Sequence, residues 1–436
     1  MRETDHLVLL QHAGHSSLLP MQSAFLKAAK EYESLALYAE TGSGKTLAFL
    51  LAALEAVPER VPNGIVVIAP SRELCLQIEQ VFRSLRTGRN AVICYGGHSV
   101  RTESNRLANF PEVLIATPGR LCDHLRNERI PHADLTQMLI IDEFDKCLEA
   151  GFSEEMHAIF DAFPYLKKKV LVSATNLAEI PTYCRMSTPF ILDERSADNE
   201  PDIREVVVPY KKDVKEAVFN LLCHFNNEKA IVFCNYREVS EDLAAALSDL
   251  GLVTTCYHGG LEQDERERAL IKFRNDSTNI LVCTDLGSRG LDIPEIRHVI
   301  HYQLPSSEEA YVHRKGRTAR MGANGHSYLL KGTDTQFPFY ITEPEEQFKV
   351  GVPLIVPKPK KRTIYVSAGK KDKVNKVDIV GFFIQQGGVN KTDIGLITVL
   401  DNSVYVALPS KSTGAILEAV RDKKLKGKRL KIAVSK

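Results

Sequence analysis

Residues 39–46 read Ala39-Glu-Thr-Gly-Ser-Gly-Lys-Thr46, and Asp142-Glu-Phe-Asp145 follows later in the chain. The first stretch has the make-up of a phosphate-binding loop. Gly42 and Gly44 allow the backbone to curl so that several N–H groups point at a polyphosphate. The second stretch follows a short apolar run, which places carboxylates at the tip of a buried strand.

The sequence around both stretches supports this interpretation. Leu35–Ala39 is typical of a strand that runs into the loop, and Leu47–Ala56 is typical of a helix that leaves it. Within the loop, Lys45 would reach the β- and γ-phosphates of a nucleotide, and the Thr46 hydroxyl would ligate Mg²⁺. Met138–Ile141 predicts the strand that carries the carboxylates. A Lys-Thr loop with a distal Asp-Glu strand end predicts a Mg²⁺-dependent nucleotidase.

Length and composition indicate an ordinary multidomain globular protein. The chain has 436 residues, 44% hydrophobic and 25% charged, which suggests two or three domains. No apolar signal region follows Met1 and no apolar stretch is long enough to span a bilayer, so we expect a soluble cytoplasmic protein. None of the nine cysteines forms a Cys-x-x-Cys pair, which favours reduced thiols packed as small hydrophobes. They are Cys75, Cys94, Cys122, Cys147, Cys184, Cys223, Cys234, Cys256 and Cys283.

Charge is distributed unevenly along the chain. The net charge is +1, yet residues from Pro357 onward contain 18 Lys and Arg against 6 Asp and Glu. The residues before them contain 38 against 49. A basic module attached to a mildly acidic body predicts that the C-terminal part attracts a polyanion, and nucleic acid is the expected one.

Short apolar runs alternate with longer helical patterns over the first 350 residues, and the series restarts after a polar stretch at 193–201. This order predicts two tandem α/β domains, each with a parallel sheet covered on both faces. Ligands of such sheets bind at the carboxyl ends of the strands, where the motifs fall. The further strands expected in the first domain are 64–69, 91–96, 113–117 and 170–173, and those in the second are 206–210, 230–234, 253–257, 280–284, 298–302 and 327–330.

A third unit follows a basic, proline-rich segment. Each proline disfavours helix at the residue before it, so 352–362 is expected to be an extended linker. Strands are predicted at 363–367, 395–400, 404–408 and 429–434, with helices at 375–386 and 413–423. This β-α-β-β-α-β order is the ferredoxin-like layout of RRM domains, a small α+β fold. The predicted domains are 1–197, 203–351 and 363–436, with 352–362 as the linker.

Residues 10–350 resemble the DEAD-box RNA helicases, whose motifs appear here in the family's order. The resemblance implies two RecA-like domains, hydrolysis of ATP with Mg²⁺, and RNA as the partner. Beside the two motifs quoted above, the residues that carry it are Pro70-Ser-Arg-Glu-Leu74, Gly96-Gly97, Thr117-Pro-Gly-Arg120, Ser173-Ala-Thr175, Thr284-Asp-Leu-Gly-Ser-Arg-Gly-Leu-Asp292 and His313-Arg-Lys-Gly-Arg-Thr-Ala-Arg320.

The same resemblance implies roles at the ATP site. Glu143 is similar to the family's general base, and Asp142 to the residue that, together with Thr46, holds Mg²⁺ through water, since this ion keeps much of its hydration shell. Arg317 and Arg320 resemble arginine fingers that stabilise charge on the transferring phosphoryl group and complete the catalytic set with Lys45. The residues implied in nucleotide binding are Gln22, Thr41, Gly42, Ser43, Gly44, Lys45, Thr46 and Asp292, and those implied in coupling between the domains are Asp145, Ser173, Thr175 and His313.

The chain departs from the family pattern at two places. His15 and Asp5 stand where the family carries aromatic residues around the adenine-reading glutamine, Gln22 here. Phe144 stands where the family has alanine, so a bulkier side chain must be packed beside Asp145.

RNA contacts are implied mostly through backbone N–H groups, hydroxyls and single arginines, which suit phosphates and 2′-hydroxyls rather than base edges. The two α/β domains are therefore expected to bind RNA irrespective of its sequence. His258 and His313 have no second ligand at metal spacing, so we expect no transition-metal site there. The implied RNA-contacting residues of the two domains are Arg72, Gly97, Thr117, Arg120, Arg266 and Thr284.

Residues 363–435 resemble the RRM-like C-terminal domain of the DbpA/YxiN subfamily, which recognises a hairpin in 23S ribosomal RNA. The resemblance is carried by Gly369–Val374, Val377–Gly381, Asp393–Gly395 and Lys426–Lys431. Only Tyr365 and Tyr405 are candidates for stacking on bases, so binding is expected to depend on cations. These are Lys370, Lys371, Lys373, Lys376, Lys426, Lys428 and Arg429.

These observations together predict an ATP-dependent RNA helicase that unwinds or remodels structured RNA, with 23S rRNA in large-subunit assembly as the target. An ATP-timed RNA-clamping chaperone or scaffold remains open, because it would use the same site. A DNA translocase of the same superfamily is the other alternative. Pre-ribosomal particles are expected partners, a membrane is not, and the lack of coiled-coil heptads favours a monomer.

Overall fold

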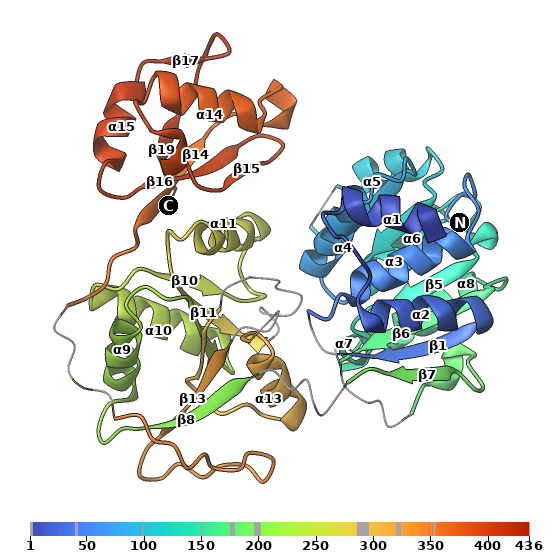
Figure 1. The fold of residues 1–436 in the computed structure, drawn as a ribbon, viewed down its shortest axis with the longest axis horizontal. Helices are drawn as coiled ribbons and strands as arrows, with labels where there is room; N and C mark the ends of the chain where they lie inside the picture. The colour runs from blue at the N-terminus through green and yellow to red at the C-terminus, as the bar shows by residue number, and fades with distance from the viewer. Residues whose placement is uncertain are drawn as a thin grey trace. The chain divides into compact units, whose positions relative to one another are not determined.

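The computed structural model separates the chain into two compact units, each of which is described by itself (Figure 1). The first contains the described residues up to 195, and the second contains those from 202 onward. The structure describes residues 3–39, 42–97, 99–149, 151–174, 179–195, 202–285, 296–319, 324–349, 351 and 355–435.

The first unit is built on a seven-stranded sheet whose paired strands all run parallel. The spatial order is β3-β4-β2-β5-β6-β1-β7. Five of the strands are completely or almost completely buried, which is why they read as continuous apolar runs. The strands are β1 (Ser34–Tyr38), β2 (Ile65–Ile68), β3 (Ala91–Cys94), β4 (Val113–Ala116), β5 (Met138–Ile141), β6 (Lys168–Ser173) and β7 (Phe190–Asp193).

Helices cover both faces of this sheet. Successive strand residues point to opposite sides, so Val67 and Ile115 join one apolar core while Val66 and Leu114 join the other. The first core packs under α2, α3 and α4, and the second packs under α6 and α8. The helices are α1 (Glu3–His12), α2 (Pro20–Glu31), α3 (Lys45–Ala56), α4 (Arg72–Ser84), α5 (Val100–Leu107), α6 (Pro118–Arg126), α7 (Phe144–Glu149) and α8 (Ser153–Ala162).

The second unit begins with a six-stranded parallel sheet in the order β10-β11-β9-β12-β13-β8. The apolar faces of α9 and α10 pack on one side of it. The strands are β8 (Ile203–Pro209), β9 (Ala230–Cys234), β10 (Thr254–Tyr257), β11 (Ile280–Thr284), β12 (His298–His301) and β13 (Gly325–Lys331), and the helices are α9 (Val214–His224), α10 (Arg237–Asp249), α11 (Gln263–Arg274) and α13 (Glu308–Lys315).

A small antiparallel sheet of four strands, ordered β15-β16-β14-β19, forms the C-terminal domain within the second unit. Its apolar face packs under two helices (Figure 1). The β-α-β-β-α-β order that the sequence predicts is therefore present. The elements are β14 (Lys361–Val366), α14 (Lys376–Gln385), β15 (Ile397–Val399), β16 (Val404–Pro409), α15 (Thr413–Val420) and β19 (Ile432–Val434).

The C-terminal domain differs in detail from its sequence-based prediction. The single strand expected at 429–434 is divided, because a hairpin of β17 (Lys424–Leu425) and β18 (Lys428–Arg429) comes before β19. Lys426 and Gly427 make its turn with φ of 48° and 78°. The first strand also starts at Lys361, inside the stretch predicted to be linker.

The predicted fold class is confirmed: two parallel-sheet domains are followed by a small α+β domain. Eight of the nine cysteines are buried free thiols and Cys256 is half-buried. Among the described residues, no helix is both long and apolar enough to cross a bilayer.

Candidate nucleotide and RNA sites

The phosphate loop joins β1 to α3 in the first unit, as the sequence predicts. Gly42 and Gly44 have φ of 87° and 85°, a region that side chains with a Cβ rarely adopt. Gly44 is also held closely from outside the loop, since a Cβ there would lie 2.4 Å from Nε2 of Gln22. Thr41, which completes the loop, lies outside the described residues.

Gln22 supports the loop from helix α2. Its Oε1 accepts a hydrogen bond from the Leu19 amide at 2.9 Å, and its Nε2 donates to the Gly44 carbonyl at 3.2 Å. The residue is 3% exposed. Both ends of the amide group therefore bind the chain itself, and adenine recognition by Gln22 stays a prediction.

Helix α3 begins at Lys45, so Lys45 and Thr46 lie in its first turn and Ser43 comes just before its N-cap residue, Gly44. Lys45 Nζ donates to the Ala39 carbonyl at 2.6 Å, which draws the ammonium group over the loop backbone. The ammonium is close enough to Asp142 to lower the pKa of that carboxyl group. The tertiary structure thus brings the two motifs to one edge of the sheet.

Asp142 follows β5 and is 4% exposed. Burial raises the pKa of its carboxyl group to about 7, Lys45 opposes this, and Glu143 and Asp145 add to it. Glu143 has φ of 48°, a left-handed conformation that is uncommon for a residue with a Cβ. Its amide donates to Oδ1 of Asp142 at 3.0 Å, so the turn that aims Glu143 is tied to the neighbouring carboxylate.

The residues fit a magnesium ion. Mg²⁺ prefers hard oxygen ligands, and the Thr46 hydroxyl and Asp142 carboxylate supply them. The pKa of Asp142 is raised mainly because burial penalises the charged carboxylate, and a divalent cation bound there would favour the charged form. When bound, the ion would neutralise charge on the phosphates.

Phe144, the departure from the family's alanine, is accommodated by the core. The residue is 0% exposed, and it joins the apolar cluster under α8 with Cys147, Met156 and Phe160. The bulky ring is thus turned away from the nucleotide side of the turn. Asp145 and Ser173 are 4% and 2% exposed, at or just after the carboxyl ends of the paired strands β5 and β6.

The RNA residues predicted in the first unit lie at the carboxyl ends of β2, β3 and β4. Arg72 begins α4, and its guanidinium lies 4.5 Å from the centre of the Tyr95 ring. Its Nε and Nη1 are buried without a hydrogen-bond partner among the described residues. Gly97 has φ of 88°, and Thr117 is the residue just before α6. Buried donors without a partner are costly, which favours a ligand with acceptor oxygens.

Arg120 is held from within the protein. Its Nε donates to the Tyr95 carbonyl at 3.2 Å and lies 3.3 Å from Oε2 of Glu103. Glu103 also receives the Tyr95 amide at 3.2 Å and contacts Nε2 of His124 at 2.7 Å. This network fixes the backbone before Gly97. Sequence reasoning missed Glu103 and His124, because a polar helix gives no sign of which acid is buried.

The second unit has a buried arginine that sequence reasoning also missed. Arg314 is 1% exposed in α13, and its guanidinium pairs with both carboxylate oxygens of Asp285 at 2.6 and 2.7 Å. It also donates to the Gln303 carbonyl and to Asn235 at 2.8 and 2.7 Å. The His-Arg-Lys-Gly-Arg motif therefore contains a residue that holds β9, β11 and β12 together.

The structure also describes Arg317, Arg266 and Thr284, which were predicted as site residues of this unit. Arg317 is 6% exposed after α13, and its Nε donates to the His313 carbonyl at 3.3 Å. Arg266 stacks over Tyr257 and donates to its hydroxyl at 3.3 Å. Thr284 is 6% exposed at the end of β11. Thr175, Asp292 and Arg320 lie outside the described residues.

The structure separates the six lysines predicted to contact RNA in the C-terminal domain into two groups. Lys426 pairs with Asp378 at 2.7 Å and Lys428 pairs with Asp372 at 3.0 Å. These contacts lower the pKa of both aspartates. The remaining four are exposed and have no carboxylate partner among the described residues, namely Lys370, Lys371, Lys373 and Lys376.

The sheet face that RRM domains use for base stacking is largely covered here. Tyr405 is 5% exposed and lies edge-on against Tyr365, with centroids 5.6 Å apart. Thr363 on the same face is hydrogen-bonded to Asn275 and Ser277, which follow α11. Tyr405 is therefore poorly placed to stack on a base.

The fold and the first site define a class: a P-loop nucleotidase with a glycine loop, a lysine and a carboxylate turn on one parallel sheet, followed by a second parallel sheet. Three family descriptions match in this order along the chain. They are DEAD/DEAH box helicase over residues 19–180, Helicase conserved C-terminal domain over 213–322, and DbpA RNA binding domain over 363–434.

Individual relatives agree with these matches. The ATP-dependent RNA helicase DbpA of Bacillus subtilis is 29% identical over 98% of this chain and 97% of its own length. The DEAD-box ATP-dependent RNA helicase RhpA of Helicobacter pylori is 33% identical over 73% of this chain and 66% of its own. A structure of Mss116p bound to ssRNA and AMP-PNP has a TM-score of 0.67 and 26% identity, covering 76% of this chain and 73% of that one.

The chain belongs to the DEAD-box family of ATP-dependent RNA helicases, and it carries a DbpA RNA-binding domain at its C-terminal end. It is accordingly an RNA-stimulated ATPase.

Proposed function

We propose that this helicase locally unwinds or remodels structured ribosomal RNA, with 23S rRNA during large-subunit assembly as its target. The observation that carries the proposal is the C-terminal domain, matched over residues 363–434 to the DbpA RNA-binding domains. Four of its exposed lysines are not neutralised by carboxylates among the described residues, so their field is available to a polyanion.

The proposed division of labour follows from the chemistry of each part. Phosphates and 2′-hydroxyls are contacted through Arg72, Arg266 and hydroxyl groups, which carry no base-specific pattern. Specificity then has to come from the C-terminal domain. In this scheme the C-terminal domain grips a structured RNA, and the parallel-sheet domains act on a neighbouring duplex.

The ATPase step is proposed to use residues of both units. Lys45 holds the phosphates, and Glu143, aimed by its strained turn, orients the attacking water and takes its proton. Arg317 and Arg320 are proposed to stabilise the developing charge on the γ-phosphate. Because Glu143 belongs to the first unit and Arg317 to the second, hydrolysis would depend on both units acting together.

A steady-state ATPase measurement tests the target. The full chain is assayed with a 23S rRNA fragment, an unrelated structured RNA and DNA of matched sequence. We expect the rRNA fragment to stimulate at about tenfold lower concentration than unrelated RNA, and DNA not to stimulate. The variant K370A/K371A should lose that preference with kcat unchanged at saturating RNA. Equal stimulation by all RNAs would contradict the ribosomal target.

The control is K211A/K212A, which removes two exposed cations from the second unit outside the C-terminal domain. It should retain the preference for the rRNA fragment. A loss of preference in both variants would mean that total charge, rather than the C-terminal domain, selects the RNA.

The alternative is an ATP-timed clamp that holds RNA without productive unwinding, and it uses the same residues. A strand-displacement assay with a short duplex beside the bound hairpin separates the two. Release of the displaced strand with ATP supports the helicase, whereas ATP hydrolysis without release supports the clamp. Action as a monomer in the cytoplasm, on pre-ribosomal particles, completes the proposal.

A further inference from the structure

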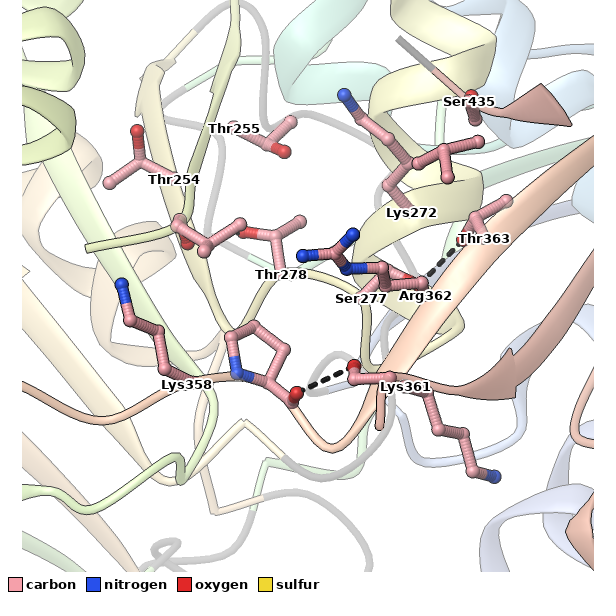
Figure 2. A pocket seen from close by; sticks show the side chains of 14 residues that line it. Thr254, Thr255, Lys272, Ser277, Thr278, Lys358, Lys361, Arg362, Thr363 and Ser435 are labelled. Atoms are coloured by element: carbon pink, nitrogen blue, oxygen red, sulfur yellow. Dashed lines mark hydrogen bonds between the residues drawn. The ribbon is translucent and has the colours of Figure 1, made fainter. Parts of the chain in front are cut away.

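A pocket of about 530 Å³ lies in the second unit where the C-terminal domain meets the parallel-sheet domain (Figure 2). On one side it is lined by Thr254 at the start of β10 and by Ser277 and Thr278 just before β11. On the other side it is lined by Arg362 of β14 and Ser435 after β19. The pocket therefore lies at the amino-terminal ends of β10 and β11, whereas the helicase motifs follow the carboxyl ends of these strands.

Four cations line the pocket and no acidic residue does. They are Lys272, Lys358, Lys361 and Arg362. Burial lowers the pKa of the Lys272 ammonium, and the nearby Arg268 lowers it further. Within the described part of the chain, none of the four forms an ion pair with a carboxylate. Gathering like charges without a counter-ion opposes folding, so the cluster favours an anionic ligand.

Hydroxyl groups complete the lining. Thr255 is 6% exposed, and its Oγ1 has no hydrogen-bond partner among the described residues. The Thr278 hydroxyl already donates to the Val253 carbonyl at 2.8 Å. A buried hydroxyl without a partner costs free energy unless a ligand or water satisfies it. Lysine, arginine and hydroxyl groups together are the side chains that contact phosphate and sugar oxygens in nucleic acids.

The walls of the pocket are tied to one another. Oγ1 of Thr363 in β14 is hydrogen-bonded to Nδ2 of Asn275 at 3.1 Å and to Oγ of Ser277 at 2.7 Å. Nζ of Lys358 donates to the Gly251 carbonyl at 3.0 Å. The pocket is therefore formed jointly by the RNA-binding domain and the helicase domain.

We propose that this pocket binds backbone phosphates of an RNA strand. An RNA chain is favoured over a small anion because one wall belongs to the RNA-binding domain, and because the stacking face of that domain is covered beside it. This proposal depends on the proposed function in one respect, the choice of RNA as the ligand. A strand held here would contact both domains of the second unit, through residues outside the helicase motifs.

The test compares K272Q/R362Q with the matched control K211Q/K212Q in the full-length protein. The probe is a 20-nucleotide labelled oligo(U), whose binding is measured without ATP across a salt series. For single strands, each phosphate that a cation neutralises contributes about 0.7 to the magnitude of the slope of log K against log salt. We expect the pocket variant to lower that magnitude by about 1.4 and to weaken binding about tenfold at low salt. The control should match the wild type.

Thermal unfolding shows whether the pocket variant is still folded. Since no described carboxylate is deprived of a partner, K272Q/R362Q should have a Tm equal to or above that of the wild type. An unchanged salt slope in a folded pocket variant overturns the proposal. A second outcome would also overturn the proposal. In it, inorganic pyrophosphate raises the Tm of the wild type and the control but not of the pocket variant, while the salt slope of RNA binding is the same in all three. The pocket would then be a site for a small anion. Because oligo(U) carries no rRNA sequence, failure of the ribosomal target would leave this test intact.

Discussion

Asp142 of the first parallel sheet and Arg314 of the second are both buried charged groups near the carboxyl ends of strands, but their surroundings differ. Asp142 of the first unit is 4% exposed, accepts a backbone hydrogen bond, and sits beside two further carboxylates that help raise its pKa. Arg314 of the second unit is 1% exposed but makes four hydrogen bonds, two of them to Asp285. A buried charge with satisfied partners holds a fold together, whereas a destabilised one marks where a ligand completes the site.

The largest effect should come from replacing Glu143, the proposed general base, in the first unit. Glu143→Gln keeps size and polarity but cannot accept the proton, so kcat should fall by about 10²–10⁴-fold. The RNA affinity and Tm of Glu143→Gln should stay at wild-type values. Lys45→Ala should also lose ATP turnover, while its C-terminal domain still binds RNA. Steady-state ATPase and RNA titration measure this. Wild-type turnover in Glu143→Gln would remove it from the role of base.

For Arg314, whose guanidinium group has hydrogen-bond partners, the expected effect of replacement is on folding. Arg314→Ala leaves Asp285 without its partner, and breaking such a buried pair costs about 3–5 kcal/mol. Chemical denaturation should show a matching decrease in the free energy of unfolding. Arg314→Lys should rescue little, because a single ammonium cannot replace the forked contacts to Asp285 and Asn235. An unfolding free energy near that of the wild type would show that the network is dispensable.

Arg72 of the first unit is the arginine with which the Arg314 variant should be compared. Two of its nitrogens lack a partner among the described residues, so Arg72→Ala should leave Tm nearly unchanged. It should instead raise the RNA concentration for half-maximal ATPase about tenfold, the scale of one charged hydrogen bond. If Arg72→Ala destabilised the protein as strongly as Arg314→Ala, the contrast between the two arginines would be wrong.

The smallest expected effect is a pH-dependent change in stability when Asp142 is replaced. The carboxyl pKa of Asp142 is about 7 in the folded state, above its ordinary value of 3.8. The protonated form is therefore favoured by folding, and this stability is lost as pH rises from 3.8 through 7. In the metal-free protein, Asp142→Asn should raise Tm by a few degrees at about pH 8 and by less at about pH 5. Thermal unfolding in a chelator measures it, and a pH-independent difference would contradict the burial argument.

The strand and the helix that flank the phosphate loop were predicted from the sequence, because the pattern that marks them is local. Glycine at positive φ, lysine and a hydroxyl follow one another in the phosphate loop, so the loop is visible without any tertiary information. Strands β9 and β11 begin and end where predicted, since fully buried parallel strands are uniformly apolar. Less regular elements were missed, among them strand β7, whose alternating exposure gives a weaker pattern.

The C-terminal domain shows where such prediction ends. Its element order was predicted, but the divided last strand was not, because Lys426 and Gly427 create a turn inside a run rich in lysine and arginine. The lysines look alike in sequence, yet two are paired with Asp372 and Asp378. Pairing depends on which residues the fold brings within reach across roughly 50 positions, and no local pattern encodes that distance.

The sequence by itself determined the class of chemistry, since a phosphate loop and a carboxylate turn consist of neighbouring residues whose spacing the chemistry requires. It also determined the two-sheet body and the basic C-terminal domain, through periodicity and charge. Only the tertiary structure decided that Arg314 is a structural residue, that Gln22 props the loop at Gly44, and that Lys272 and Arg362 line one pocket. Burial and partnership are properties of packing, and residues distant in sequence acquire them only when the chain is folded.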